Sequence, residues 1–333
     1  MLKSLKLISL VGAALFLFPH GLRAQEAPAQ EKPAPEKIIY AGSPGISVPV
    51  IVALAKGYFA EEGLEVEYET IETGKLGMEA LLAGRADFAS VVATNLVYAG
   101  FQTDALRVIA SYGVSLDDAV MFPADSPIQK PADLKGKKIG LAASTSSQAF
   151  LIRLLEKNGM SWGDITPVPL QPPAGAAALI GGQIDAFVTW QPWRTAIRKA
   201  FEGKVREIEN DGFYPRQSFC AATQAWLDAH PGVAEKLLRA LIRAEADINL
   251  HPEESARIVA VRTEQDMAFA RSYVVPPFRV DMNKDILPLV TSYAEWVVKN
   301  QEEFIGKPLP DYGKNLATGP MKAVVPERVG EGM

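Results

Sequence analysis

The stretch LIGGQIDAFVTWQPW, Leu179 to Trp193, decides the fold because the chain has already used its pattern once. Earlier, LLAGRADFASVV, Leu81 to Val92, carries the same apolar helix end, glycine, aspartate and strand-like run. A glycine after an apolar helical pattern ends the helix, and a short apolar run after a turn is typical of a buried strand. Two copies of one helix-turn-strand unit predict two lobes built alike.

The aspartates of the two copies, Asp87 and Asp185, open their strands. In open α/β sheets, ligands bind outside the carboxyl ends of the strands, which is the opposite edge. A turn or capping role therefore fits both aspartates better than a role in ligand binding.

Short apolar runs alternate with amphipathic helical runs from Lys37 onward, which is typical of an α/β protein. Two proline-containing crossings divide the chain, so we expect a discontinuous first lobe of residues 37–119 and 218–333 and a second lobe of residues 120–217. Two linking strands would join the lobes around a cleft. The tail after Ile305 is rich in Pro and Gly, and we expect it to be loosely ordered.

The N-terminus has the features of an export signal. Lys3 and Lys6 precede an apolar run, and Ala24 offers a small residue for cleavage, so residues 1–24 are interpreted as a signal peptide. A membrane anchor is the alternative, but the apolar run is short for a bilayer. Residues 25–36 are Pro, Ala and Glu rich and predict a disordered linker. No cysteine follows the signal to carry a lipid, which favours the periplasm.

Composition excludes several classes of function. The net charge is −5 and becomes −8 without the three basic residues of the signal, so binding to a nucleic-acid backbone is not expected. Cys220 is the only cysteine, so the chain can form no internal disulfide. His230 and His251 alone remain after the signal, and no P-loop or dinucleotide motif is present. We predict no catalytic residue, metal or cofactor, although a pair of acid and base carboxylates stays open.

Small polar residues at helix starts are the candidate ligand-binding groups. In AASTSSQAF, Thr145 followed by Gln148 fits a capping box, and the first-turn amides and the helix dipole favour an anion there. Equivalent junctions supply the other candidates. The predicted ligand-binding residues are Ser43, Gly45, Thr73, Lys75, Thr94, Asn95, Thr145, Ser146, Ser147, Trp190 and Gln191.

Each candidate has a plainer interpretation. The Thr145 turn can be ordinary capping without a ligand, and Lys75 can be a solvated first-turn lysine. Trp190 can belong to the core instead of forming an apolar wall for a ligand. Arg216, near the second crossing, can either reach a bound anion or form a surface ion pair.

Five motifs in order resemble a known family over nearly the whole chain after the signal. They are AKGYFAEEGLEVEYE from Ala55, ALLAGRADFA from Ala80, DLKGKKIGL from Asp133, AALIGGQIDAFVTWQP from Ala177 and HPEESARIVA from His251. The chain resembles the periplasmic substrate-binding proteins of ABC importers of the nitrate, sulfonate and taurine type, with an NMT1/THI5-like domain.

This resemblance implies a two-lobed periplasmic-binding-protein fold of type II that closes on a small ligand. It also implies a monomer that delivers its ligand to an ABC permease and the permease's ATPase. A small organic anion such as a sulfonate is the leading hypothesis for the ligand. Nitrate, bicarbonate, an aromatic acid or a pyrimidine precursor of thiamine stay open as alternatives, as do a pyrimidine-synthase-like enzyme and a sensing domain without a permease.

Overall fold

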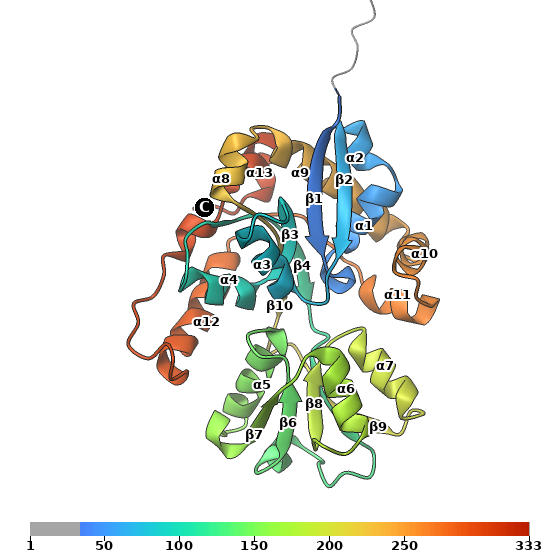
Figure 1. Cartoon of the computed structure of the whole chain (residues 1–333), viewed down its shortest axis with the longest axis vertical. Helices are drawn as coiled ribbons and strands as arrows, with labels where there is room; N and C mark the ends of the chain where they lie inside the picture. The colour runs from blue at the N-terminus through green and yellow to red at the C-terminus, as the bar shows by residue number, and fades with distance from the viewer. Residues whose placement is uncertain (1–33, 333) are drawn as a thin grey trace, which may run out of the picture. The chain divides into compact units, whose positions relative to one another are not determined.

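The computed structural model describes residues 34–332. The predicted signal peptide, residues 1–24, and most of the predicted linker, residues 25–36, lie outside the described residues. The chain from Pro35 onward forms one compact unit that contains two five-stranded sheets flanked by helices (Figure 1). The predicted α/β fold class is therefore confirmed. No helix within residues 34–332 is long and apolar enough to cross a membrane.

The first sheet has the strand order β2-β1-β3-β10-β4. Its strands are β1 (Glu36–Gly42), β2 (Leu64–Thr70), β3 (Phe88–Val92), β4 (Leu106–Ser115) and β10 (Arg216–Thr223). β1 runs parallel to β2 and β3, whereas β10 runs antiparallel to β3 and β4. We call this sheet and its helices the first lobe.

The second sheet repeats this arrangement in the order β7-β6-β8-β5-β9. Its strands are β5 (Ala119–Pro123), β6 (Lys138–Leu141), β7 (Thr166–Pro169), β8 (Ala186–Thr189) and β9 (Val205–Glu209). β6 pairs in parallel with β7 and β8, and β5 is antiparallel to β8 and β9. In each sheet the antiparallel strand in the fourth place is the one through which the chain crosses from the other lobe. We call this sheet and its helices the second lobe.

Helices cover both sheets, because the parallel strands need crossover connections. The first lobe has η1 (Pro44–Ile46), α1 (Val48–Ala55), α2 (Tyr58–Glu61), α3 (Gly74–Leu82), α4 (Ala93–Gly100), α8 (Gln224–Ala229), α9 (Val233–Leu250), α10 (Pro252–Thr263), α11 (Met267–Tyr273), α12 (Ile286–Asn300), η4 (Tyr312–Asn315), α13 (Thr318–Val324) and η5 (Pro326–Arg328). The second lobe has η2 (Pro131–Leu134), α5 (Ser146–Lys157), η3 (Trp162–Asp164), α6 (Pro172–Ile180) and α7 (Trp193–Ala200). Figure 1 shows α5, α6 and α7 around the second sheet.

The two sequence copies occupy equivalent places in the two lobes. Asp87 accepts a hydrogen bond of 2.7 Å at Oδ2 from the amide of Ile39 in β1, and Asp185 accepts one of the same length from the amide of Lys138 in β6. In both copies the aspartate amide returns a bond of 2.9 Å to the same neighbouring residue. Asp87 thus connects the start of β3 to β1, and Asp185 connects the start of β8 to β6. Each carboxylate also accepts a bond from a backbone amide that has no partner in the neighbouring strand.

The prediction of a loosely ordered tail after Ile305 is wrong. Tyr312 is buried and its hydroxyl donates a hydrogen bond of 2.8 Å to the carbonyl of Val97. Asn315 donates one of 2.8 Å to the carbonyl of Leu106, and Met321 is fully buried. The prolines and glycines shape short turns in a segment that packs on α4 and β4, so composition alone misjudged it.

Candidate functional site

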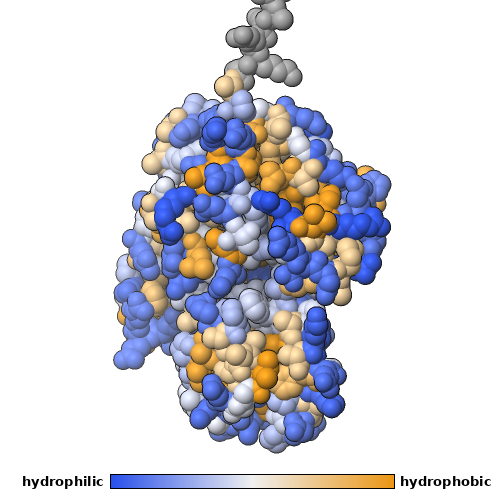
Figure 2. Space-filling view, turned by 45° about the vertical axis from the view of Figure 1, so that its right-hand side comes forward, coloured by the Kyte–Doolittle hydropathy of each residue, from blue (hydrophilic) through white to orange (hydrophobic). Residues whose placement is uncertain are grey.

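The helix starts of both lobes meet where the lobes face one another, because the parallel strands deliver their carboxyl ends to that edge. Eight of the predicted site residues there are buried, namely Thr73, Thr94, Asn95, Thr145, Ser146, Ser147, Trp190 and Gln191. The Asn95 side-chain amide of the first lobe lies 3.5 Å from the carbonyl of Ser144 in the second. Figure 2 shows residues of hydrophilic to intermediate hydropathy where the lobes meet. The candidate residues of the two lobes therefore come into contact with one another.

The turn before α5 differs in detail from the predicted capping box. Ser144 has a φ of 59°, in the left-handed region, and its amide donates to Gln148 Oε1 at 2.7 Å. The Thr145 hydroxyl donates instead to the carbonyl of Ala142 at 2.7 Å, so the side chain of Thr145 does not cap the helix. The predicted box is wrong because the turn places Gln148 against the residue before the cap. The first amides of α5 have no intrahelical partner and stay available to a ligand.

Three charged side chains on the two linkers lie under this turn. Arg216, at the start of β10, forms an ion pair with Asp117 and lies with Nη1 3.5 Å from Asp118 Oδ2. The Ser146 hydroxyl donates to Asp118 Oδ1 at 2.9 Å, and the amide of Gln191 donates to Asp117 Oδ2 at 3.0 Å. Arg216 is thereby connected to two segments of the second lobe. Asp118 links it to Ser146 at the start of α5, and Asp117 links it to Gln191 after β8.

Burial raises the pKa of the Asp118 carboxyl to about 6, and the adjacent Asp117 raises it as well, while Arg216 opposes both effects. Asp118 is completely buried and Arg216 is 3% exposed. The positive charge of Arg216 is therefore already compensated by two acids. The three side chains carry a net charge of −1 when Asp118 is ionised and none when it is protonated.

Unpartnered polar atoms concentrate at the same place. Of the six buried side-chain polar atoms without a hydrogen bond in the described part of the chain, four are Thr94 Oγ1, Asp118 Oδ2, Thr189 Oγ1 and Arg216 Nε. Thr189 lies opposite Ala119 in the pairing of β8 with β5, beside Asp118. A buried polar atom without a partner is costly, so a set of donors and acceptors of this kind is suited to a ligand that satisfies them.

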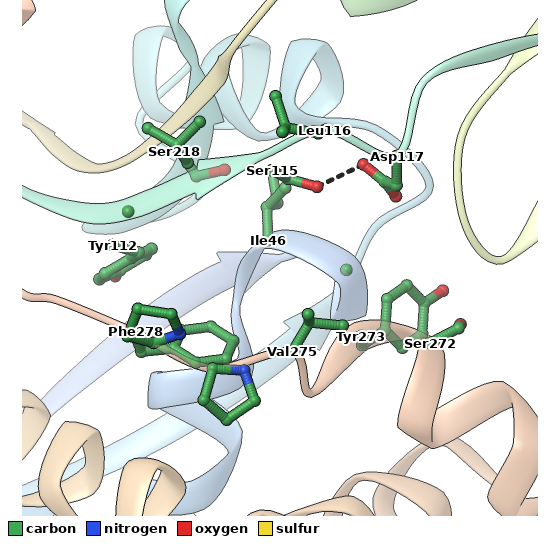
Figure 3. Close-up of a pocket in the computed structure, with 15 residues that line it drawn as sticks. Ile46, Tyr112, Ser115, Leu116, Asp117, Ser218, Ser272, Tyr273, Val275 and Phe278 are labelled. Carbon is green, nitrogen blue, oxygen red and sulfur yellow. Dashed lines mark hydrogen bonds between the residues drawn. The ribbon is translucent and has the colours of Figure 1, made fainter. Parts of the chain in front are cut away.

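Thr94, Asp118, Thr189 and Arg216 line neither of two cavities, but a residue near them in sequence lines each cavity, Asp117 the first and Pro192 the second. The first, of about 360 Å³, is lined by Gly45, Ile46, Ser218, the stretch 112–117 and residues 272, 273 and 275–278 (Figure 3). The second, of about 570 Å³, is lined from both lobes, by the stretches 43–44 and 70–72 and parts of 262–269 on one side and by α7 residues on the other. Tyr273 lines both cavities, so α11 and its C-terminal end form a wall between them.

Ser43, Gly45, Thr73 and Lys75 differ in whether they line a cavity. Ser43 lines the second cavity and Gly45 the first. The Thr73 hydroxyl accepts from the amide of Leu76 at 3.4 Å, which is a capping role. Lys75 lines neither cavity, and its ammonium lies 3.9 Å from Glu79 in a half-exposed pair.

Gln191 and Trp190 contribute differently from the expectation. The Gln191 side-chain oxygen accepts from the amide and hydroxyl of Thr195, at 3.2 and 2.8 Å, so that oxygen holds the start of α7. Trp190 is 8% exposed and lines neither cavity, whereas Trp193 lines the second cavity.

Sequence reasoning missed Asp117, Asp118 and Tyr273. The two acids open the first crossing and Arg216 opens the return crossing, so opposite charges at the two linkers were a usable signal. Tyr273 lies in a helix far along the chain and had no such signal. It packs so closely on Gly45 that a Cβ there would lie 2.6 Å from its ring, which explains the glycine.

Comparison with known proteins gives consistent matches. The model of the NMT1/THI5-like family matches residues 46–255. A putative aliphatic sulfonates-binding protein of Bacillus subtilis is 28% identical over 265 residues, which cover 77% of this chain and 76% of the relative. The taurine-binding periplasmic protein of Escherichia coli is 27% identical over 209 residues, covering 62% of this chain and 64% of the relative.

Solved structures share the fold. The alkanesulfonate-binding protein of Xanthomonas axonopodis, bound to MOPS, superposes with a TM-score of 0.75 at 20% identity and covers 85% of this chain and 98% of its own. The desulfurization enzyme DSZB superposes with a TM-score of 0.65 at 15% identity, covering 88% of this chain and 99% of its own. The same fold thus serves binding proteins and at least one enzyme, so the fold alone does not separate the two functions.

Proposed function

The chain belongs to the NMT1/THI5-like family, and on that premise we propose that it is the solute-binding component of an ABC importer and captures a small organic anion of the sulfonate type between its lobes. The observation that carries this proposal is the set of three buried donors without a hydrogen bond where both lobes and both linkers meet, namely Thr94 Oγ1, Thr189 Oγ1 and Arg216 Nε. The names of the sulfonate- and taurine-binding relatives support the choice of ligand.

The chemistry of the site suits a sulfonate head. A sulfonate has three acceptor oxygens, and the site has unpartnered donors in Arg216 Nε and the hydroxyls of Thr94 and Thr189. The free first amides of α5 and its dipole add favourable interactions with negative charge. The guanidinium of Arg216 is shared with two acids, so binding at this point depends on neutral donors as well as on its charge.

Capture and release need no chemical step. A ligand that contacts both lobes stabilises the closed arrangement, and a permease can then select that arrangement. A reactive thiol is disfavoured, since Cys220 is fully buried and burial raises its pKa to about 11. We therefore propose a binding protein and not an enzyme, which acts as a monomer in the periplasm with a permease and its ATPase as partners.

A thermal-shift screen tests the ligand class. We expect alkanesulfonates to raise the melting temperature and nitrate, bicarbonate, aromatic acids and pyrimidines to leave it unchanged. A ligand present at 100 times its dissociation constant adds about 2.7 kcal/mol to the free energy of unfolding, which such a screen detects. A shift with one of the other classes and none with any sulfonate would reassign the ligand.

The affinity for a sulfonate should rise as the pH falls from 8 to 5. The sulfonate stays ionised, whereas Asp118, with its pKa near 6 and Asp117, Arg216 and Arg194 around it, loses its negative charge in this range. If the bound anion raises that pKa by one unit, the affinity increases about tenfold across the range. Titration calorimetry at several pH values measures this.

Two variants test the assignment of that pH dependence. Asp118→Asn should flatten it, whereas Asp211→Asn, which removes an exposed acid paired with Lys157, should leave it unchanged. An affinity that is flat with pH in the wild-type protein would mean that Asp118 does not sense the ligand.

A further inference from the structure

The two lobes are joined by a hydrogen bond that lies apart from the candidate anion site. Trp296, on α12 of the first lobe, donates through its indole Nε1 to Oε1 of Glu156, near the C-terminal end of α5 in the second lobe. Figure 1 shows α12 and α5 on the same side of the molecule, opposite α7, α10 and α11. The second cavity is lined by parts of those three opposite helices, so the bond and the cavity lie on different sides.

The indole of Trp296 is held in place by the first lobe. Its ring stacks on that of Tyr293, with 6.4 Å between the centroids, and Tyr293 lies edge-on to Tyr98 of α4 at 6.3 Å. Gln301, just after α12, donates to the Tyr98 hydroxyl at 2.7 Å, and Phe304 packs on the same ring at 5.8 Å. The position of the indole donor is therefore fixed relative to α4.

Glu156 is held in place by the second lobe. Arg153, one turn earlier on α5, has Nη1 3.6 Å from Oε2 of Glu156, so the two carboxylate oxygens have different partners. The opposite face of α5 is buried through Phe150, Leu151 and Leu154. The Glu156 side chain is 42% exposed, so water competes for it and the bond has the strength of one ordinary hydrogen bond.

The bond gives α5 a second point of attachment to the first lobe. The first point is the contact of Asn95 with the carbonyl of Ser144, just before α5. From Ser146 to Glu156 the helix rises about 15 Å, at about 1.5 Å per residue. A helix attached at two separated points cannot turn away from the first lobe while both contacts persist, so separation of the lobes requires the bond of Trp296 to break.

Resting on the proposed function, we propose that the bond between Trp296 and Glu156 is a latch that stabilises the closed arrangement of the lobes and so prolongs retention of the bound anion. Neither residue lines either cavity, so the latch acts through closure and not through contact with the ligand. Its loss lowers the fraction of closed protein. The apparent affinity then falls by the same factor for every ligand that the closed form binds.

Calorimetric titration with methanesulfonate and butanesulfonate tests the latch. Trp296→Phe keeps a ring on Tyr293 and removes the donor, whereas Glu156→Ala removes the acceptor. Each should raise both dissociation constants about two- to tenfold, the scale of one hydrogen bond. The double variant should lose no more than the weaker-binding single variant, because the same bond is absent in all three.

Two further variants separate the bond from general effects of substitution. Glu156→Gln keeps an acceptor oxygen and should retain most of the affinity. Glu295→Ala removes an exposed glutamate beside Trp296 on α12 and should bind both sulfonates as the wild-type protein does. Losses that add up in the double variant, or a loss confined to one of the two sulfonates, would overturn the inference and leave the proposed function standing.

Small-angle X-ray scattering of the ligand-free proteins tests the latch without any sulfonate. Trp296→Phe and Glu156→Ala should have a larger radius of gyration than the wild-type protein, and Glu295→Ala should match it. Equal radii in all four proteins would overturn the inference whatever the affinities. A wild-type protein that binds neither sulfonate would contradict the proposed function, and the scattering alone would then decide whether the latch exists.

Discussion

Replacing Arg216 by Met is expected to lower the free energy of unfolding by about 3–5 kcal/mol, because breaking a buried ion pair leaves an uncompensated buried charge. Arg216 is 3% exposed and faces Asp117 and the fully buried Asp118. Without the guanidinium, two neighbouring carboxylates share a poorly solvated space. Sulfonate affinity should also fall more than a hundredfold, since the site loses its charged donor.

Urea unfolding at pH 7 measures the loss in the free energy of unfolding. A second arginine variant, in which an exposed ion pair is removed, serves as the control. Arg239→Met removes an exposed pair with Glu62, so it should cost no more than about 1 kcal/mol. A cost for Arg216→Met as small as that for Arg239→Met would show that the cluster of linker charges does not hold the lobes together.

The origin of the cost can be tested through Asp118. Adding Asp118→Asn to Arg216→Met should recover part of the lost stability, because it removes the buried negative charge. Lower pH should do the same. Arg216 lowers the pKa of Asp118, which is about 6 in the wild-type protein, so Arg216→Met raises it further. The deficit of Arg216→Met should therefore shrink as the pH falls toward about 6 and level off below it, where Asp118 is protonated in both proteins. A deficit independent of both changes would indicate lost packing instead.

Much of the fold could be predicted from one repeated unit. The glycine and aspartate shared by the two copies predicted equivalent helix-turn-strand units, and Asp87 and Asp185 make equivalent bonds in the structure. Such local patterns depend on residues close in sequence. The tail could not be predicted in this way, because what orders it is the contact of Tyr312 with α4, which joins residues far apart in the chain.

The sequence predicted which strand ends and helix starts form the candidate site, but it did not predict how the charged side chains there pair. Strand ends and helix starts placed Thr94, Asn95 and Ser146 at the meeting point of the lobes, where the structure also has them. The pairing of Arg216 with Asp117 and Asp118 depends on how two linkers lie side by side, which no local pattern encodes. Even the turn before α5 was misjudged in detail, since the left-handed conformation of Ser144 redirected Gln148.

Ser146→Glu should reduce sulfonate affinity more than a hundredfold. The new carboxylate would lie at the first residue of α5, where the free amides are proposed to meet the anion, and beside Asp118, to which Ser146 donates at 2.9 Å. It would occupy the anion position and repel a second negative charge. Because Ser146 is buried, we also expect the free energy of unfolding to fall by about 1–3 kcal/mol.

Two further variants separate these effects. Ser146→Ala removes only the hydroxyl and keeps the amides, so its affinity should stay within about tenfold of the wild-type value, the scale of one hydrogen bond. Thr318→Glu places the same carboxylate at the first residue of α13, away from the cleft, and should leave binding unchanged. Circular dichroism and urea unfolding confirm that each variant is folded at the temperature of the titration.

The most direct test of an anion site between the lobes is a calorimetric titration of butanesulfonate into the wild-type protein and Ser146→Glu in parallel. We expect saturable binding of one sulfonate per chain in the wild-type protein and no measurable binding in the folded variant. Equal affinities in the two proteins, or a wild-type protein that binds no sulfonate, would contradict it.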